Sequence, residues 1–350
     1  MSGTLSHREN VEIAVIGDGA WGTTLAWLQA QECRRVSLVV LEGTTAEEIT
    51  KYHVNSRAFD WLRLPSNIIA VTSIAEAVNR AAAVIVAVPS GALRAVARDV
   101  CEAGCTSPVV IATKGMERGT GLLGVEVWRE ESRRSRPDTL VLSGPNLASE
   151  IAGGRPAVSV LAGASTRRVN SAIKLLRRPG LSLYPWHDPV GAQCMGALKN
   201  VYAIACGMAA GLGWGANVSS AMIWRGLEEA REFAAALGAD PNVTGTPAGI
   251  GDFVATCSSP LSRNYGMGMG MARAGGEVPG VREGEGAAIE ASRRARSLGL
   301  ELPLLESITA VLMNSGPPER VMEAATEQSR PRGQEHKVKA MGLSTATEGA

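Results

Sequence analysis

Residues 12–23 read Glu-Ile-Ala-Val-Ile-Gly-Asp-Gly-Ala-Trp-Gly-Thr, an apolar run followed by glycines in the spacing Gly17-x-Gly19-x-x-Gly22. A short apolar run that ends at glycine is typical of a buried parallel strand, and residues 21–31 after it predict a helix. In such a unit the first glycine permits the tight turn and the second lets a pyrophosphate approach the backbone, while the third lets the helix pack on the strand. The stretch therefore predicts a dinucleotide site at the N-terminus of the helix.

The rest of the chain divides into a part with strands and a part without them. Further apolar runs lie at 36–41, 82–88, 109–113 and 139–142, with helix-like segments such as 92–101 between them. This alternation favours an α/β fold, a Rossmann-like doubly wound parallel sheet with helices on both faces. Beyond about residue 185 the predicted elements are helices, at 190–210, 219–237, 286–298 and 304–313. We expect a disordered N-terminus (1–10), a dinucleotide-binding domain (11–186), a mostly helical substrate domain (187–330) and a disordered tail (331–350).

Composition argues against several classes of partner. A net charge of +1 indicates no nucleic-acid or membrane-surface partner through charge alone, and 4% aromatic residues further weaken the case for a platform that stacks single strands. Six cysteines and four histidines show no metal-ligand spacing, and residues 1–10 lack the apolar core of a secretory signal. We therefore expect a reduced, cytoplasmic protein without a metal site. Residues 189–213 are apolar, but Lys199 near their centre favours a helix buried in protein over a membrane span.

The end of the second predicted strand should meet the adenosine ribose of a bound dinucleotide. Glu42 follows that strand, where a carboxylate would accept hydrogen bonds from ribose hydroxyls and repel a 2′-phosphate. Residues 39–45 contain no arginine or lysine. These residues favour NAD over NADP, although a strand-end glutamate that only faces solvent explains Glu42 equally well.

Lys199 is the candidate proton-transfer residue. It lies in the predicted apolar helix at 190–210, next to Asn200 and among small or apolar neighbours. Burial disfavours the charged ammonium and lowers its pKa, which makes a lysine usable as an acid or a base near neutral pH. The alternative is a lysine that extends from a core helix to solvent at a bend.

Two further sets of residues suit an anionic substrate. Lys114 follows the predicted strand at 109–113, and ligands of doubly wound folds bind outside the carboxyl ends of the strands. Ser262, Arg263 and Asn264 are consecutive, and the planar guanidinium of Arg263 matches a phosphate group. On composition alone an ordinary polar turn explains residues 262–264 equally well.

Together these pieces resemble the NAD(P)-dependent glycerol-3-phosphate dehydrogenase family, and the resemblance runs from about residue 11 to residue 301. The motifs that carry it, in the family's order, are Gly-Asp-Gly-Ala-Trp-Gly-Thr (17–23), Ala-Val-Pro-Ser (87–90), Ala-Thr-Lys-Gly-Met-Glu (112–117), Ser-Gly-Pro (143–145), Gly-Ala-Leu-Lys-Asn-Val (196–201), Gly-Leu-Gly-Trp-Gly-Ala-Asn (211–217), Arg-Gly-Leu (225–227), Gly-Ile-Gly-Asp (249–252) and Ser-Arg-Asn (262–264). So many motifs in the correct succession are highly specific.

The resemblance implies an enzyme that interconverts dihydroxyacetone phosphate and sn-glycerol 3-phosphate, with Lys199 as proton donor and acceptor. It also implies that Lys114 lowers the pKa of Lys199. The predicted substrate-binding residues are Lys114, Gly144, Asn146, Lys199, Asn200, Asp252, Thr256, Ser262, Arg263 and Asn264. The predicted cofactor-binding residues, for NAD or NADP, are Gly17, Gly19, Ala20, Trp21, Gly22, Glu42, Pro89, Lys114, Ala148, Arg263, Val281 and Glu283. Dimers are common in the family, so a homodimer stays open.

Several positions depart from the family pattern and leave alternatives open. Asn146 stands where the family has Ser or Thr beside the substrate, and Leu41 stands where NADP-using members have a basic residue. Gln193, Trp224 and the pair Thr246-Pro247 replace a glutamate, a threonine and Gly-Leu. A paralogue acting on a related phosphorylated three-carbon ketone or alcohol is therefore an alternative. A second alternative is a hydroxy-acid dehydrogenase, against which residues 262–264 argue. A third is a non-catalytic dinucleotide sensor, against which Lys199 argues.

Overall fold

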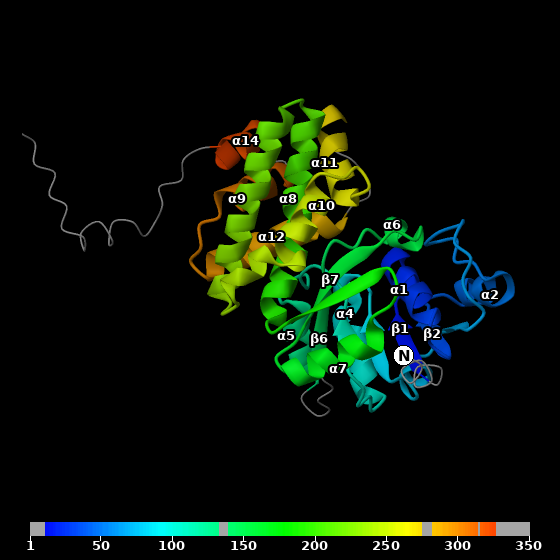
Figure 1. Ribbon diagram of the computed structural model, residues 1–350. Helices are drawn as coiled ribbons and strands as arrows, with labels where there is room; N and C mark the ends of the chain where they lie inside the picture. The colour runs from blue at the N-terminus through cyan, green and yellow to red at the C-terminus, as the bar shows by residue number, and fades with distance from the viewer. Residues whose placement is uncertain (1–10, 133–138, 275–281, 314–315, 327–350) are drawn as a thin grey trace, which may run out of the picture.

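The computed structural model describes residues 11–132, 139–274, 282–313 and 316–326 (Figure 1). Within these residues eight strands form one sheet in the order β3-β2-β1-β4-β5-β6-β7-β8. Their bounds are β1 (Glu12–Ile16), β2 (Arg35–Val39), β3 (Ile68–Val71), β4 (Ala83–Val86), β5 (Val109–Ile111), β6 (Thr139–Ser143), β7 (Ala157–Ala162) and β8 (Leu181–Trp186). Strands β1 to β6 are parallel, so β1 and β4 flank the point where the strand order reverses. That point is where doubly wound folds bind their ligands.

Helices cover both faces of this sheet, as the alternating sequence pattern predicts. They are α1 (Ala20–Ala30), α2 (Gly43–Tyr52), α3 (Ile74–Val78), α4 (Leu93–Glu102), α5 (Gly124–Glu131), α6 (Ala148–Ala152) and α7 (Thr166–Leu176). Alternate residues of β1 face different cores: Ile13 and Val15 pack in one cluster with α1, and Ala14 and Ile16 pack in another with α4. The central strands are therefore buried on both sides, which explains their nearly continuous apolar sequences.

The second part of the chain is helical and is built around one buried helix, α8 (Pro189–Gly211), which Figure 1 shows among the helices of this part. The others are α9 (Gly215–Ala236), α10 (Asp252–Cys257), α11 (Arg263–Ala274), α12 (Arg282–Ser297), α13 (Pro303–Leu312) and α14 (Glu319–Thr326), with short helical turns at Pro241–Gly245 and Pro247–Gly251. Glycines let α11 approach α8 closely: a Cβ on Gly207 or on Gly268 would lie 2.0 Å from a backbone oxygen of the other helix. Among the described residues, no helix has the length and apolarity that crossing a membrane requires.

The structure confirms the fold class and corrects the sheet. The predicted strands at 12–16, 36–41, 82–88, 109–113 and 139–142 correspond to β1, β2, β4, β5 and β6. Strand β7 pairs with β6 in the antiparallel direction and with β8 in the parallel direction, so the last two strands run against the other six. The sequence patterns did not predict β3, β7 and β8. The predicted disordered ends, 1–10 and 331–350, lie outside the described residues.

Candidate active site

The glycine turn after β1 has the geometry of a pyrophosphate cradle. Gly17 has φ +115°, and a Cβ there would lie 2.5 Å from the carbonyl oxygen of Ala87. A Cβ on Gly22 would lie 1.9 Å from the carbonyl oxygen of Gly17, whereas one on Gly19 would meet no atom within 4 Å. Gly17 and Gly22 are thus required by the backbone itself, and Gly19 faces open space at the N-cap of α1. The residues fit a dinucleotide, because that space lies where helix N–H groups point.

Asn55 supports this turn, and no sequence pattern predicts this role. Its buried side-chain amide donates hydrogen bonds to the carbonyl oxygen of Asp18 and to Oγ1 of Thr23, both at 2.8 Å. Asn55 lies between α2 and β3, far along the chain from the glycines, and belongs to no periodic pattern. Its role depends on tertiary packing alone.

Most of the other predicted cofactor residues follow the carboxyl ends of strands, as the glycine turn does. Ala20 and Trp21 begin α1, and the indole Nε1 of Trp21 is buried without a hydrogen-bond partner among the described residues. Pro89 follows β4, and Ala148 begins α6, where its carbonyl oxygen accepts a hydrogen bond from Thr24 Oγ1 of α1 at 3.3 Å. Glu42 is the N-cap residue of α2. Val281 lies outside the described residues, as does the side chain of Glu283.

The structure brings Lys199, Asp252, Thr256 and Lys114 together. Lys199 is 6% exposed, and its Nζ donates hydrogen bonds to Asp252 Oδ1 and to Thr256 Oγ1, the latter at 2.8 Å. The other oxygen of the buried Asp252 accepts a hydrogen bond from Lys114 Nζ at 2.8 Å. Lys114 Nζ also donates to the carbonyl oxygen of Gly144 at 3.1 Å. One carboxylate therefore lies between two ammonium groups, although the three residues are far apart in the sequence.

Burial is the main influence on Lys199. Loss of hydration lowers the pKa of Lys199, the charge of Asp252 opposes this and the charge of Lys114 adds to it, and the net pKa is about 7. Near neutral pH the ammonium and the neutral amine are therefore both populated. A group of this kind can donate a proton and take it back.

Polar atoms without partners mark the predicted substrate side of the site. Asn146 accepts a hydrogen bond from Ser159 Oγ at 2.7 Å through its Oδ1, but its Nδ2 has no partner among the described residues. Ser143 Oγ and Asn264 Oδ1 are likewise buried without a partner there. Because an unsatisfied buried polar group is costly, such atoms indicate a place for a polar ligand.

The predicted phosphate residues lie at the start of α11. Ser262 is buried, and its Oγ accepts a hydrogen bond from the backbone N–H of Tyr265 at 3.3 Å; Arg263 is the first residue of the helix and is exposed. Asn264 lies beside α8, since a Cβ on Gly284 would be 2.5 Å from its Oδ1 and 2.8 Å from Cδ1 of Ile204. Asn200 is half-buried next to Lys199.

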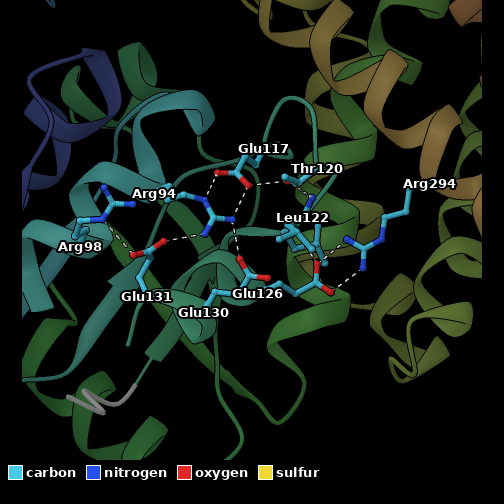
Figure 2. A network of polar contacts seen from close by, with 10 residues as sticks. Arg94, Arg98, Glu117, Thr120, Leu122, Glu126, Glu130, Glu131 and Arg294 are labelled. Atoms are coloured by element: carbon cyan, nitrogen blue, oxygen red, sulfur yellow. Dashed lines mark hydrogen bonds and ion pairs between the residues drawn. The ribbon is translucent and has the colours of Figure 1, made fainter. Parts of the chain in front are cut away.

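A polar network fixes the loop that follows Lys114 between the two parts of the chain (Figure 2). On one side, Arg94 of α4 makes a two-pronged ion pair with Glu117, at 2.7 and 2.8 Å, and a further one with Glu131 at 2.8 Å. On the other side, Arg294 of α12 donates two hydrogen bonds to Glu126 and one to the carbonyl oxygen of Gly121, at 2.6 to 2.7 Å. The loop carrying Lys114 is therefore attached to both the sheet and the helical part.

A glycine turn at the switch point of a doubly wound sheet, together with a buried lysine of near-neutral pKa, defines the class of dinucleotide-dependent dehydrogenases. Residues 12–169 match the family described as NAD-dependent glycerol-3-phosphate dehydrogenase N-terminus, and residues 188–323 match its C-terminus. The chain belongs to the NAD-dependent glycerol-3-phosphate dehydrogenase family.

Individual relatives agree with this membership. The chain is 34% identical to a glycerol-3-phosphate dehydrogenase [NAD(P)+] of Corynebacterium urealyticum, over 91% of this chain and 99% of that protein. It is 37% identical to the enzyme of the same name from Corynebacterium glutamicum, over 86% and 93%. Among solved structures, the glycerol-3-phosphate dehydrogenase of Coxiella burnetii is similar with a TM-score of 0.84 and 27% identity, over 91% of this chain and all of that one.

Proposed function

We propose that this chain interconverts dihydroxyacetone phosphate and sn-glycerol 3-phosphate with NAD(H) or NADP(H). The observation that carries the proposal is the buried Lys199, whose ammonium is held by Asp252 and Thr256 beside a second ammonium, that of Lys114. We divide the chain at residues 186–187 into a dinucleotide-binding domain and a substrate domain, with the reacting groups between them.

Lys199 moves the proton of this reaction. In reduction its ammonium donates a proton to the ketone oxygen of the substrate; in oxidation its neutral amine takes the proton from the hydroxyl. Asp252 and Thr256 hold Nζ in place during both steps. Because the pKa of Lys199 is about 7, neither direction requires an improbable protonation state.

The remaining predicted residues bind and orient. A bound nicotinamide dinucleotide supplies or accepts the hydride at the central carbon of the substrate. The glycine turn with Ala20 and Trp21, together with Glu42, Pro89 and Ala148, holds that dinucleotide. Ser262, Arg263 and Asn264 hold the phosphate of the substrate, and Lys114 attracts its negative charge. A homodimer stays a prediction.

The test is oxidation of NADH and of NADPH by the purified protein, with dihydroxyacetone phosphate and with unphosphorylated dihydroxyacetone. We expect turnover with dihydroxyacetone phosphate and at least about a hundredfold lower kcat/KM with dihydroxyacetone, since the phosphate contacts are lost. Equal values for the two substrates would exclude a phosphate site. Binding of NADH without turnover of either substrate would favour a non-catalytic dinucleotide sensor.

Asn146 favours one variant of this function, a related phosphorylated three-carbon ketone or alcohol as substrate. Its Nδ2, which has no partner among the described residues, can only donate, whereas the family's hydroxyl can donate or accept, so Asn146 selects for an acceptor on the substrate at that place. Values of kcat/KM for a panel of phosphorylated three-carbon ketones distinguish this variant from the function proposed above. A kcat/KM highest for dihydroxyacetone phosphate, in wild type and in Asn146→Ser alike, would rule out the variant.

A further inference from the structure

The adenosine side of the cofactor site holds an ion pair that sequence analysis of the strand end did not predict. Arg57 Nη1 lies 2.6 Å from Oε1 of Glu42, the residue expected to meet the adenosine ribose. Residues 39–45 contain no basic side chain, and Arg57 comes from the loop at residues 53–67, between α2 and β3. The structure therefore supplies a cation at the very place where the local sequence lacks one.

The backbone just before Arg57 is fixed. On the N-terminal side, Asn55 donates two hydrogen bonds at 2.8 Å to the glycine turn, through Asp18 and Thr23. The next residue, Ser56, donates its N–H and its Oγ to Glu48 of α2, at 3.2 and 3.1 Å. The loop is thus attached both to the glycine turn and to the helix that Glu42 begins. Arg57 is held on the adenosine side of the dinucleotide site before any ligand binds.

The pair differs chemically from a lone strand-end glutamate. An unpaired carboxylate at this position repels the 2′-phosphate of NADP(H), and that repulsion is the basis of NAD selectivity in such folds. Here the charge of Glu42 is balanced by Arg57, whose planar guanidinium has the shape that matches a phosphate. Both side chains are about half exposed, at 50% and 53%, so Arg57 can turn from the carboxylate to a phosphate without leaving a buried charge unpaired.

We propose that Arg57 binds the 2′-phosphate of NADP(H), so that the Glu42–Arg57 pair lets this chain bind NADPH as well as NADH. This rests on the proposed function, since it concerns the cofactor of that same site. With NADH bound, Glu42 accepts a hydrogen bond from the ribose 2′-hydroxyl while Arg57 stays paired with it. With NADPH bound, Arg57 turns to the phosphate, and Glu42 is the group that limits affinity.

The experiment is isothermal titration of NADH and of NADPH into wild type, Arg57→Gln, Glu42→Gln and Lys51→Gln. Lys51→Gln is the matched control, because it removes the same charge from the end of α2 without touching Glu42. Wild type should bind both dinucleotides. Arg57→Gln should weaken NADPH binding about tenfold or more and change the Kd of NADH by less than about threefold, since one charge-assisted contact to the phosphate is lost. Glu42→Gln should weaken NADH and strengthen NADPH.

The outcomes separate this inference from the function on which it rests. If wild type binds NADH but not NADPH, or if Arg57→Gln and Lys51→Gln leave the same ratio of the two Kd values as wild type, the role of Arg57 is wrong and the dehydrogenase proposal stands. If wild type binds neither dinucleotide, both are wrong. The Kd of NADH also shows that each variant is folded.

Discussion

Asp252→Asn should move the pH profile of the enzyme in a direction fixed by the charges around Lys199. Asp252 is fully buried and accepts hydrogen bonds from both Lys199 and Lys114. Its negative charge raises the pKa of Lys199, while burial and Lys114 lower it. Replacing the carboxylate by a neutral amide removes the raising influence, so the pKa of Lys199 should fall below its present value.

The size of the effect follows from the contact. An opposite charge in direct contact shifts a pKa by roughly 1–3 units, so the pKa of Lys199 should fall from about 7 to about 6 or lower. At pH 8 about one molecule in ten of wild type carries the protonated lysine needed for ketone reduction, and about one in a hundred of the variant does. Protonation alone therefore lowers the reduction rate about tenfold at pH 8, and the loss diminishes as the pH is lowered.

The assay is kcat for NADH oxidation by dihydroxyacetone phosphate from pH 5.5 to 9, in wild type, Asp252→Asn and Asp240→Asn. Asp240→Asn is the matched control, because this carboxylate pairs with His187 near the start of α8. The midpoint of the alkaline decline should shift down only in Asp252→Asn. An unchanged or raised midpoint would refute the electrostatic account of Lys199, whatever the absolute rate.

Three further predictions concern the cofactor turn, the link between the two parts and a buried carboxyl. Gly19→Ala should keep the melting temperature and weaken NADH binding at least about tenfold, because its Cβ would enter the open cradle. Gly22→Ala should lower the melting temperature, because its Cβ would lie 1.9 Å from a carbonyl oxygen. The reverse pattern, with Gly19→Ala unstable and Gly22→Ala stable, would contradict the geometry. Arg294→Gln should lower the free energy of unfolding in urea by about 1–3 kcal/mol, since the partly buried Glu126 loses its charged partner. An unchanged free energy of unfolding would show that the link is dispensable. Burial raises the pKa of Glu229 to about 7 from an ordinary value near 4.5. Its favourable contribution to the stability of the folded state is therefore fully present below pH 4.5 and is lost as the pH rises to about 7. Glu229→Gln should remove that part of the slope of stability against pH, and equal slopes in the two proteins would contradict the assignment.

Sequence patterns predicted β1, β2, β4, β5 and β6, and they missed the two edge strands and the interior strand β7. Strand β1 is apolar throughout because two cores cover it, and the predicted and observed bounds agree. Strands β3 and β8 lie at the two edges of the sheet, where exposed positions such as Ile69 and Tyr184 interrupt the burial pattern. The antiparallel direction of β7 depends on its pairing with β6, which no local pattern encodes.

The site was predictable to the extent that single residues or known motifs carried it. Burial of Lys199 followed from the apolar helix around it, and the glycine spacing indicated the turn. The meeting of Lys114, Lys199 and Asp252 was implied only by the family resemblance, because packing brings these residues together. Asn55 was not predicted at all, since its hydrogen bonds reach back to a turn 37 positions earlier, at Asp18.

The most direct test of the central claim is Lys199→Ala, measured for both turnover and cofactor binding. Because Lys199 alone moves the proton and does not hold the dinucleotide, kcat for dihydroxyacetone phosphate reduction should fall about 10²- to 10⁴-fold. The Kd of NADH should stay within about threefold of the wild-type value. The corresponding change in binding free energy is well below the ~1.4 kcal/mol of a tenfold change. A variant that binds NADH and turns over at the wild-type rate would contradict the assignment of Lys199 as the proton donor and acceptor.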